Sequence, residues 1–150
     1  MNNIMKTETG LFIVSYRIAS PNLGAPTFDV HLAVNTPGKS VTGKGVVRNP
    51  TVNPPLNVFT ELRGDFTYMT VMPKETHILV VAEGYPHFNF PPHAGIGPVI
   101  LPNTKLRMVL EADWQSGTAN YAYADDKGNW HEVNDAAVTI IKVNEFAASN

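Results

Sequence analysis

The sequence contains no cysteine, which excludes disulfide bonds, thiol catalysis and thiolate metal sites. It also lacks an excess of one charge, because 11 basic residues against 13 acidic ones give a formal net charge of -2. No basic stripe of the kind that nucleic-acid binding requires is present. No apolar stretch approaches the ~20 residues of a membrane-spanning helix, and the N-terminus lacks the apolar run of a secretory signal. The simplest interpretation is a soluble cytoplasmic protein without a nucleic-acid partner or membrane span, although leaderless export stays open.

Short apolar runs with a period of two dominate the 150 residues, and the 12 prolines spread among them leave little room for helix. In the run at 28–34, for example, Phe28, Val30, Leu32 and Val34 share one face. Roughly nine or ten such runs, spaced as in sandwiches and barrels, predict one antiparallel β domain over residues 1–150. We expect a β-sandwich, with a closed β-barrel as the alternative, and frayed termini at 1–9 and 146–150.

Glycines mark two places in this pattern. The runs 56–62 and 66–72 flank Arg63-Gly64-Asp65, which predicts a hairpin with Gly64 in its tight turn. Gly43 and Gly45 fall on the apolar face of the run 41–48. Glycines at such positions indicate either a sharp bend of the strand or the close approach of another group to its backbone.

Three segments carry a resemblance to a known family. They are SPNLGAPTF at 20–28, GDFTYMTVM at 64–72 and HILVVAEGYP at 77–86. With them the chain resembles, over roughly residues 11–86, a small family of bacterial proteins known only as a domain of unknown function. The resemblance implies a bacterial origin and a compact β domain, and it assigns no activity and no functional residue.

The segment from Gly84 to Pro98 is rich in aromatic residues, proline and histidine. It is too apolar for a solvated linker and too rich in proline and glycine for a strand, which predicts an ordered loop that packs on something. Its candidate binding residues are Tyr85, His87, Phe88, Phe90 and His93.

The histidines of this loop raise the question of a metal site. His87 and His93 with Glu83 could contribute ligands for a borderline ion such as Zn²⁺. Their spacing matches no established motif, and a full ligand set would have to recruit His77 or His131 from elsewhere in the fold. Loop histidines that bond to backbone carbonyls are the favoured interpretation, so we expect no metal and no cofactor.

Catalytic patterns are weak. No serine lies in a nucleophile elbow. Glu111 and Asp113 share one face of a strand and could form a carboxylate pair, but a solvated strand face explains them better. The segment 125–129 superficially resembles a calcium loop but has the composition of a hairpin turn. No catalytic residue is assigned, and an enzyme is the least favoured class.

Aromatic residues of the C-terminal strands complete the candidate site, because Tyr121 and Trp130 could converge with the loop at 84–98. We expect a non-enzymatic module that uses this loop for protein interaction or self-assembly, as a homo-oligomer or with another protein. The alternative is a binder of an apolar or sugar-like small molecule with a pocket beneath the loop.

Overall fold

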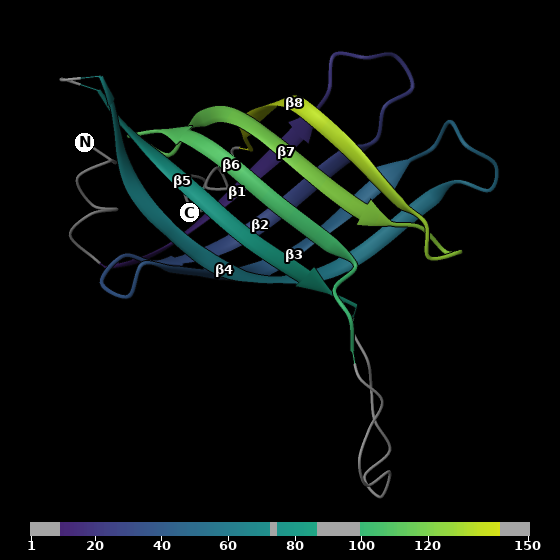
Figure 1. The fold of residues 1–150 in the computed structure, drawn as a ribbon, viewed down its shortest axis with the longest axis horizontal. Coiled ribbons are helices and arrows are strands. Elements are labelled where there is room, and N and C mark those ends of the chain that lie inside the picture. The colour runs from purple at the N-terminus through teal and green to yellow at the C-terminus, as the bar shows by residue number, and fades with distance from the viewer. Residues whose placement is uncertain (1–9, 73–74, 87–99, 142–150) are drawn as a thin grey trace, which may run out of the picture.

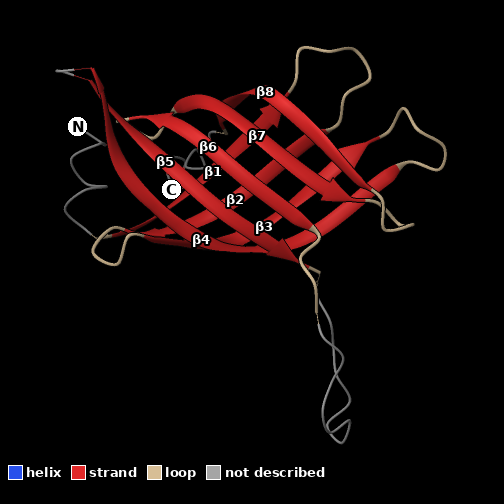
Figure 2. Cartoon of the chain, viewed as in Figure 1, coloured by secondary structure: helices blue, strands red, loops and turns tan. Residues whose placement is uncertain are grey.

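A computed structural model of the chain describes residues 10–72, 75–86 and 100–141, with the side chains of 71 and 72 left aside. The described residues form eight strands and no helix (Figure 2). No helix in this part of the chain is therefore long and apolar enough to cross a membrane. The strands are β1 (Leu11–Ala19), β2 (Thr27–Asn35), β3 (Ser40–Asn49), β4 (Leu56–Met72), β5 (Glu75–Tyr85), β6 (Thr104–Glu111), β7 (Ser116–Ala124) and β8 (Trp130–Ile140).

The eight strands form a closed antiparallel barrel in which each strand pairs with its sequence neighbours (Figure 1). Residues Tyr16–Ala19 of β1 pair with Ala137–Ile140 of β8 and close the ring. The expected β-sandwich is therefore wrong, and so is the expected strand number. Period-two alternation indicates that one face of each strand is buried, but it does not say whether that face packs on a second sheet or on the inside of the same sheet.

The hairpin predicted at Arg63-Gly64-Asp65 is also wrong, because β4 runs through this position without a break. Gly64 faces the barrel interior, where a Cβ atom would overlap the carbonyl oxygen of Val81 and the backbone of Ala82. Its role is close approach between strands and not a tight turn. Two expected strands thus merge into one of 17 residues.

Gly43 has the same role on β3. A Cβ atom there would overlap the carbonyl oxygen of His31 on the neighbouring strand. Of the two alternatives that the sequence indicates for Gly43 and Gly45, the structure shows the close approach of another group, and at Gly43 that group is the barrel's own backbone. Strongly coiled strands of this kind let a small sheet close on itself.

In the C-terminal strands, the turn after β6 contains Trp114, which has a positive φ of 66°. β8 runs without a break from Trp130 to Ile140, with a register shift against β7 at Ala119–Tyr121. Residues 100 and 101 belong to no strand.

Side chains fill the barrel interior. The core comes from every strand, and its largest completely buried members include aromatic, aliphatic and methionine side chains: Tyr16, Ile18, Phe28, Leu32, Ile78, Met108 and Leu110. An eight-stranded barrel is just wide enough for such filling. Functional surfaces of the described residues must therefore be sought on the outside of the barrel and at its two ends.

The two ends of the barrel carry different connections (Figure 1). The turn end has the short connections 36–39 and 112–115 and the far end of the β4–β5 hairpin. The loop end has the connections 20–26, 50–55, 86–103 and 125–129. Of the connection 86–103, only residues 86 and 100–103 are described.

Candidate functional site

Aromatic rings close the turn end from inside. Trp114 folds inward from its turn and lies edge-on to Phe12 and Phe66, with ring centroids 5.2 and 5.1 Å away. The Tyr16 hydroxyl donates a hydrogen bond of 2.6 Å to the Trp114 carbonyl oxygen. Edge-to-face contacts of this kind stabilise beyond the area they bury. The turn end is consequently a structural plug.

A polar side chain connects two loops at the loop end. The buried Asn49 donates from Nδ2 to the Gly24 carbonyl oxygen at 3.2 Å, and its Oδ1 accepts from the Thr51 hydroxyl at 2.6 Å. These bonds join the β1–β2 loop to the β3–β4 loop. Asparagine suits this place because its amide both donates and accepts.

A second asparagine, Asn103, joins three strands at the loop end. Asn103 Nδ2 donates to the Phe59 carbonyl oxygen at 3.1 Å, and its Oδ1 accepts from the Thr60 hydroxyl at 2.7 Å. Its backbone N–H donates to Gly84 and its carbonyl oxygen accepts from Ala124. One residue therefore connects β4, β5 and β7, which fixes the described part of the β5–β6 connection.

The loop end, including the start of β4, exposes apolar side chains to solvent. Phe59 is 67% exposed and Leu101 is 70% exposed, while Leu23 and Val52 are exposed on the two loops that Asn49 joins. Beside Phe59 lies a hollow of about 320 Å³ whose lining includes Val46 and Thr60. We call Leu23, Val52, Phe59 and Leu101 the loop-end surface. Single exposed apolar residues carry no meaning, but four on connected segments at one end of a barrel make that end a candidate interaction surface.

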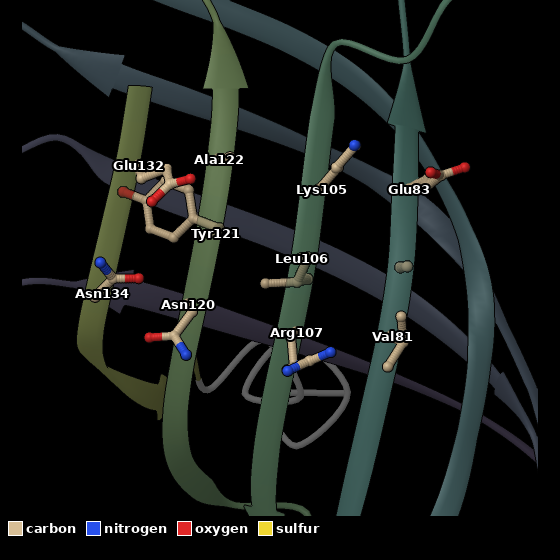
Figure 3. A pocket seen from close by; sticks show the side chains of 11 residues that line it. Val81, Glu83, Lys105, Leu106, Arg107, Asn120, Tyr121, Ala122, Glu132 and Asn134 are labelled. Carbon is tan, nitrogen blue, oxygen red and sulfur yellow. The ribbon is translucent and has the colours of Figure 1, made fainter. Parts of the chain in front are cut away.

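A second hollow lies on the outer wall of β5–β8 and measures about 330 Å³ (Figure 3). Its lining includes Glu83, Lys105, Arg107 and Glu132, all exposed. Cross-strand register explains the hollow, because the small Ala122 stands between Lys105 and Glu132 in one row across the sheet. We call it the outer-wall hollow.

The three described aromatic residues of the predicted site differ in burial and in their partners. Tyr121 is buried in the core, and its hydroxyl donates to the Pro26 carbonyl oxygen at 3.3 Å. Trp130 is exposed, with the Lys105 ammonium 5.6 Å from its ring centroid. Tyr85 donates from its hydroxyl to Glu83 Oε1 at 3.1 Å. Tyr121 is nevertheless one of the residues that line the outer-wall hollow, and Tyr85 and Trp130 each contact a charged residue of that hollow.

The remaining predicted site residues His87, Phe88, Phe90 and His93 lie outside the described residues. The pocket expected beneath the loop at 84–98 involves these residues, so it also lies outside the described part of the chain. In the part that the structure describes, no three histidine or acidic residues are grouped closely enough to hold a metal ion.

The two histidines considered as additional metal ligands have other neighbours. His77 lies between Glu75 and Glu111, with nitrogen to oxygen distances of 3.6 and 3.8 Å, and its buried Nδ1 has no hydrogen-bond partner among the described residues. His131 lies 2.8 Å from Asp125 Oδ2 and stacks on Tyr123. The hydrogen bond from His131 is the main reason that the pKa of Asp125 lies below its ordinary value.

The other patterns considered for catalysis also have structural roles. Asp125 Oδ1 accepts from the backbone N–H groups of Lys127 and Asn129, as in a hairpin turn, which agrees with the favoured interpretation of 125–129. Asp113 accepts from the Gln115 N–H within its turn, and Glu111 lies next to His77. The pair is thus not brought together on one strand face.

Sequence reasoning missed the loop-end surface, although one signal was present. In the run 56–62 the inward positions are Val58, Thr60 and Leu62, so Phe59 is out of phase with them. A large aromatic residue on the solvent face of a strand is such a signal. Asn49 and Asn103 gave none, because asparagine is common in loops.

The family model for a domain of unknown function, DUF1842, matches residues 9–130. The chain belongs to the DUF1842 family. No curated protein matches it. The family match ends at the first residue of β8, the strand that closes this barrel against β1.

Proposed function

We propose that this DUF1842 protein is a non-catalytic assembly module that pairs with a second copy of itself through the loop-end surface. One observation carries the proposal: the exposed Phe59 ring forms one wall of a hollow that is lined further by Val46 and Thr60 and by the side chains of His31, Lys44 and Glu61. The same patch therefore holds both a protruding group and a recess.

A two-fold axis brings identical patches face to face, so a patch with a protrusion and a recess can complement itself. In such a pair, Phe59 of each copy enters the hollow of the other copy. Leu101 adds apolar surface next to it, because Asn103, two residues further on, bonds to the Phe59 carbonyl oxygen. The filled interior also supports assembly over ligand storage, because it leaves the outer surface for recognition.

The test is solution mass by light scattering. The wild-type chain is expected at twice its 16.4 kDa mass. Phe59→Ser removes two rings from each dimer, and at a hot-spot value of about 2 kcal/mol each this weakens pairing roughly 1,000-fold. The variant is expected to be a folded monomer with an unchanged circular dichroism spectrum.

Ile13→Ser is the matched control, because Ile13 is 78% exposed on the outer wall of β1 at the opposite end of the barrel. It is expected to remain dimeric. A wild-type chain that stays monomeric up to roughly 100 µM would contradict the proposal. So would a dimer that Ile13→Ser dissociates and Phe59→Ser does not.

A further inference from the structure

The outer-wall hollow lies on strands that do not contribute to the loop-end surface. Its lining residues come from β5, β6, β7 and β8, whereas Phe59 and its neighbouring hollow belong to β2, β3 and β4. Figure 3 shows side chains from four adjacent strands around the recess. The outer-wall hollow and the loop-end surface therefore share no residue.

The hollow is balanced in charge. Glu83 and Glu132 contribute two negative charges, and Lys105 and Arg107 contribute two positive ones. None of the four is within ion-pair distance of another residue in the part that the structure describes. A site with no net charge does not favour a strongly charged ligand, and the four groups together offer both donors and acceptors.

An amide in the lining of the hollow is held in a fixed orientation. Asn120 Oδ1 accepts a hydrogen bond of 2.8 Å from the backbone N–H of Asp135. Asp135 has a positive φ of 58° within β8, beside the register shift between β7 and β8. Because the oxygen of Asn120 is engaged, its NH₂ group is the part that can serve a ligand as donor.

Apolar surface completes the lining. Val81 and Trp130 are both exposed, with Val81 in the lining and Trp130 in contact with the lining residue Lys105. Ala122 provides a small apolar base between the longer side chains. Few precisely placed polar groups around an apolar base are typical of small-molecule sites, and 330 Å³ lies at the lower end of their size range of ~300–1,000 Å³.

From this combination we infer that the outer-wall hollow binds a neutral hydroxylated ligand, a saccharide of one or two rings. Sugar hydroxyls donate and accept at once, so they can bridge carboxylates, cations and amides that are too far apart to pair with one another. The C–H faces of a sugar ring suit Val81 and Ala122. The hollow is open, so binding is expected to be weak, with a Kd of roughly 1–10 mM.

The test is an NMR titration of the full chain with glucose, galactose, mannose, xylose and N-acetylglucosamine, each to roughly 50 mM. At least one sugar is expected to shift the backbone amides of Lys105–Arg107 and Asn120–Ala122. Glucuronate and glycine are the charged and zwitterionic comparison compounds, and both are expected to bind at least 10-fold more weakly than that sugar.

Two variants make the result specific. Ala122→Phe fills the hollow and is expected to weaken sugar binding at least 10-fold, while Thr118→Phe places the same ring on an exposed site of the same strand outside the lining and leaves binding unchanged. Arg107→Ala removes an exposed hydrogen-bond donor and is expected to weaken sugar binding about 10-fold. It replaces Ala122→Phe as the test variant if Ala122→Phe fails to fold. The inference is overturned if no sugar shifts these amides, if only glucuronate or glycine does, or if the substitutions in the hollow leave the Kd unchanged.

Discussion

The two ends of the barrel use apolar side chains in opposite ways. At the turn end, Phe12, Phe66 and Trp114 point inward and close the barrel as a plug. At the loop end, asparagine side chains hold the loops together, and apolar residues such as Phe59 and Leu101 point into solvent.

The difference separates stability from recognition. Burying the rings at the turn end stabilises the fold, because it removes apolar area from water. Exposed side chains such as Phe59 and Leu101 do not stabilise the fold of an isolated chain. The polar connections at the loop end hold both residues in place without burying them. An end built in this way is suited to contact another surface.

The largest expected effect comes from the barrel wall that both ends share. In Gly43→Ala the new Cβ atom meets the carbonyl oxygen of His31, so we expect a loss of at least ~4 kcal/mol in the free energy of unfolding. Gly24→Ala is the control at the loop end, where the Cβ atom has open space and only a positive φ of 79° to adopt. Its cost is expected at about 1–2 kcal/mol by urea denaturation, and equal losses for the two variants would refute the role of Gly43.

Trp114→Ala and Leu101→Ala compare the two ends directly. Removing the ring from the plug is expected to cost about 3–5 kcal/mol, because it leaves a cavity against Phe12 and Phe66. Removing the exposed Leu101 side chain is expected to change stability by less than about 0.5 kcal/mol. Urea denaturation of each variant under conditions that keep it monomeric measures both, and a large loss for Leu101→Ala would show that this residue belongs to the core.

Asn49→Ala tests the polar connection between the loops. The variant loses the bonds to Gly24 and Thr51, and we expect a cost of about 1–3 kcal/mol. Asn57→Ala, at an exposed position on β4, is the control and is expected to be nearly neutral. A neutral Asn49→Ala variant that still pairs normally would mean that the loops need no such connection.

Alkaline titration tests the burial of Tyr16, the residue whose hydroxyl joins the plug to the barrel wall. Burial is the main reason that the pKa of Tyr16 lies above its ordinary value of 10.0. A raised pKa in the folded state means that stability is complete below the ordinary value and falls as the pH rises above it. We expect Tyr16 to account for about 1 kcal/mol of the stability lost between pH 9 and 11, so that the loss is smaller in Tyr16→Phe. An identical pH dependence in the two proteins would contradict this.

The smallest expected effect lies at the loop end, in the turn at 125–129. The pKa of Asp125 is lower in the folded state than in the unfolded chain. The ionised Asp125 side chain therefore stabilises the fold above the ordinary aspartate pKa, and this stabilisation is lost as the pH falls through the pKa of the folded state. Asp125→Asn is therefore expected to have a lower melting temperature than the wild type at pH 7 and the same one at strongly acidic pH. A difference that persists unchanged at acidic pH would exclude titration of Asp125 as its cause.

The sequence predicts most strand positions because each strand keeps its own alternation. Phe28, Val30, Leu32 and Val34 are all buried, as their spacing indicates. Closure of the barrel could not be predicted, because it depends on the pairing of β1 with β8, which lie more than 100 residues apart. The turn predicted at Gly64 was wrong because a glycine between two apolar runs is compatible with either a turn or a close approach, and only the neighbouring strand distinguishes them.

The sequence predicts candidate site residues but not how their side chains point. Aromatic residues drew attention, but period-two spacing does not show whether a ring near a strand end points inward, as Tyr121 does, or outward, as Trp130 does. The outer-wall hollow depends on a cross-strand row through Lys105, Ala122 and Glu132, residues that come together only when the register is known.

NMR spectra of the wild-type chain recorded over a dilution series show whether the loop end contacts a second copy. We expect the amide shifts that depend on concentration to belong to Leu23, Val52, Phe59 and Leu101 and their neighbours, while those around Trp114 stay constant. Shifts that do not change with concentration, or that change around Trp114 and Ile13 instead, would contradict it.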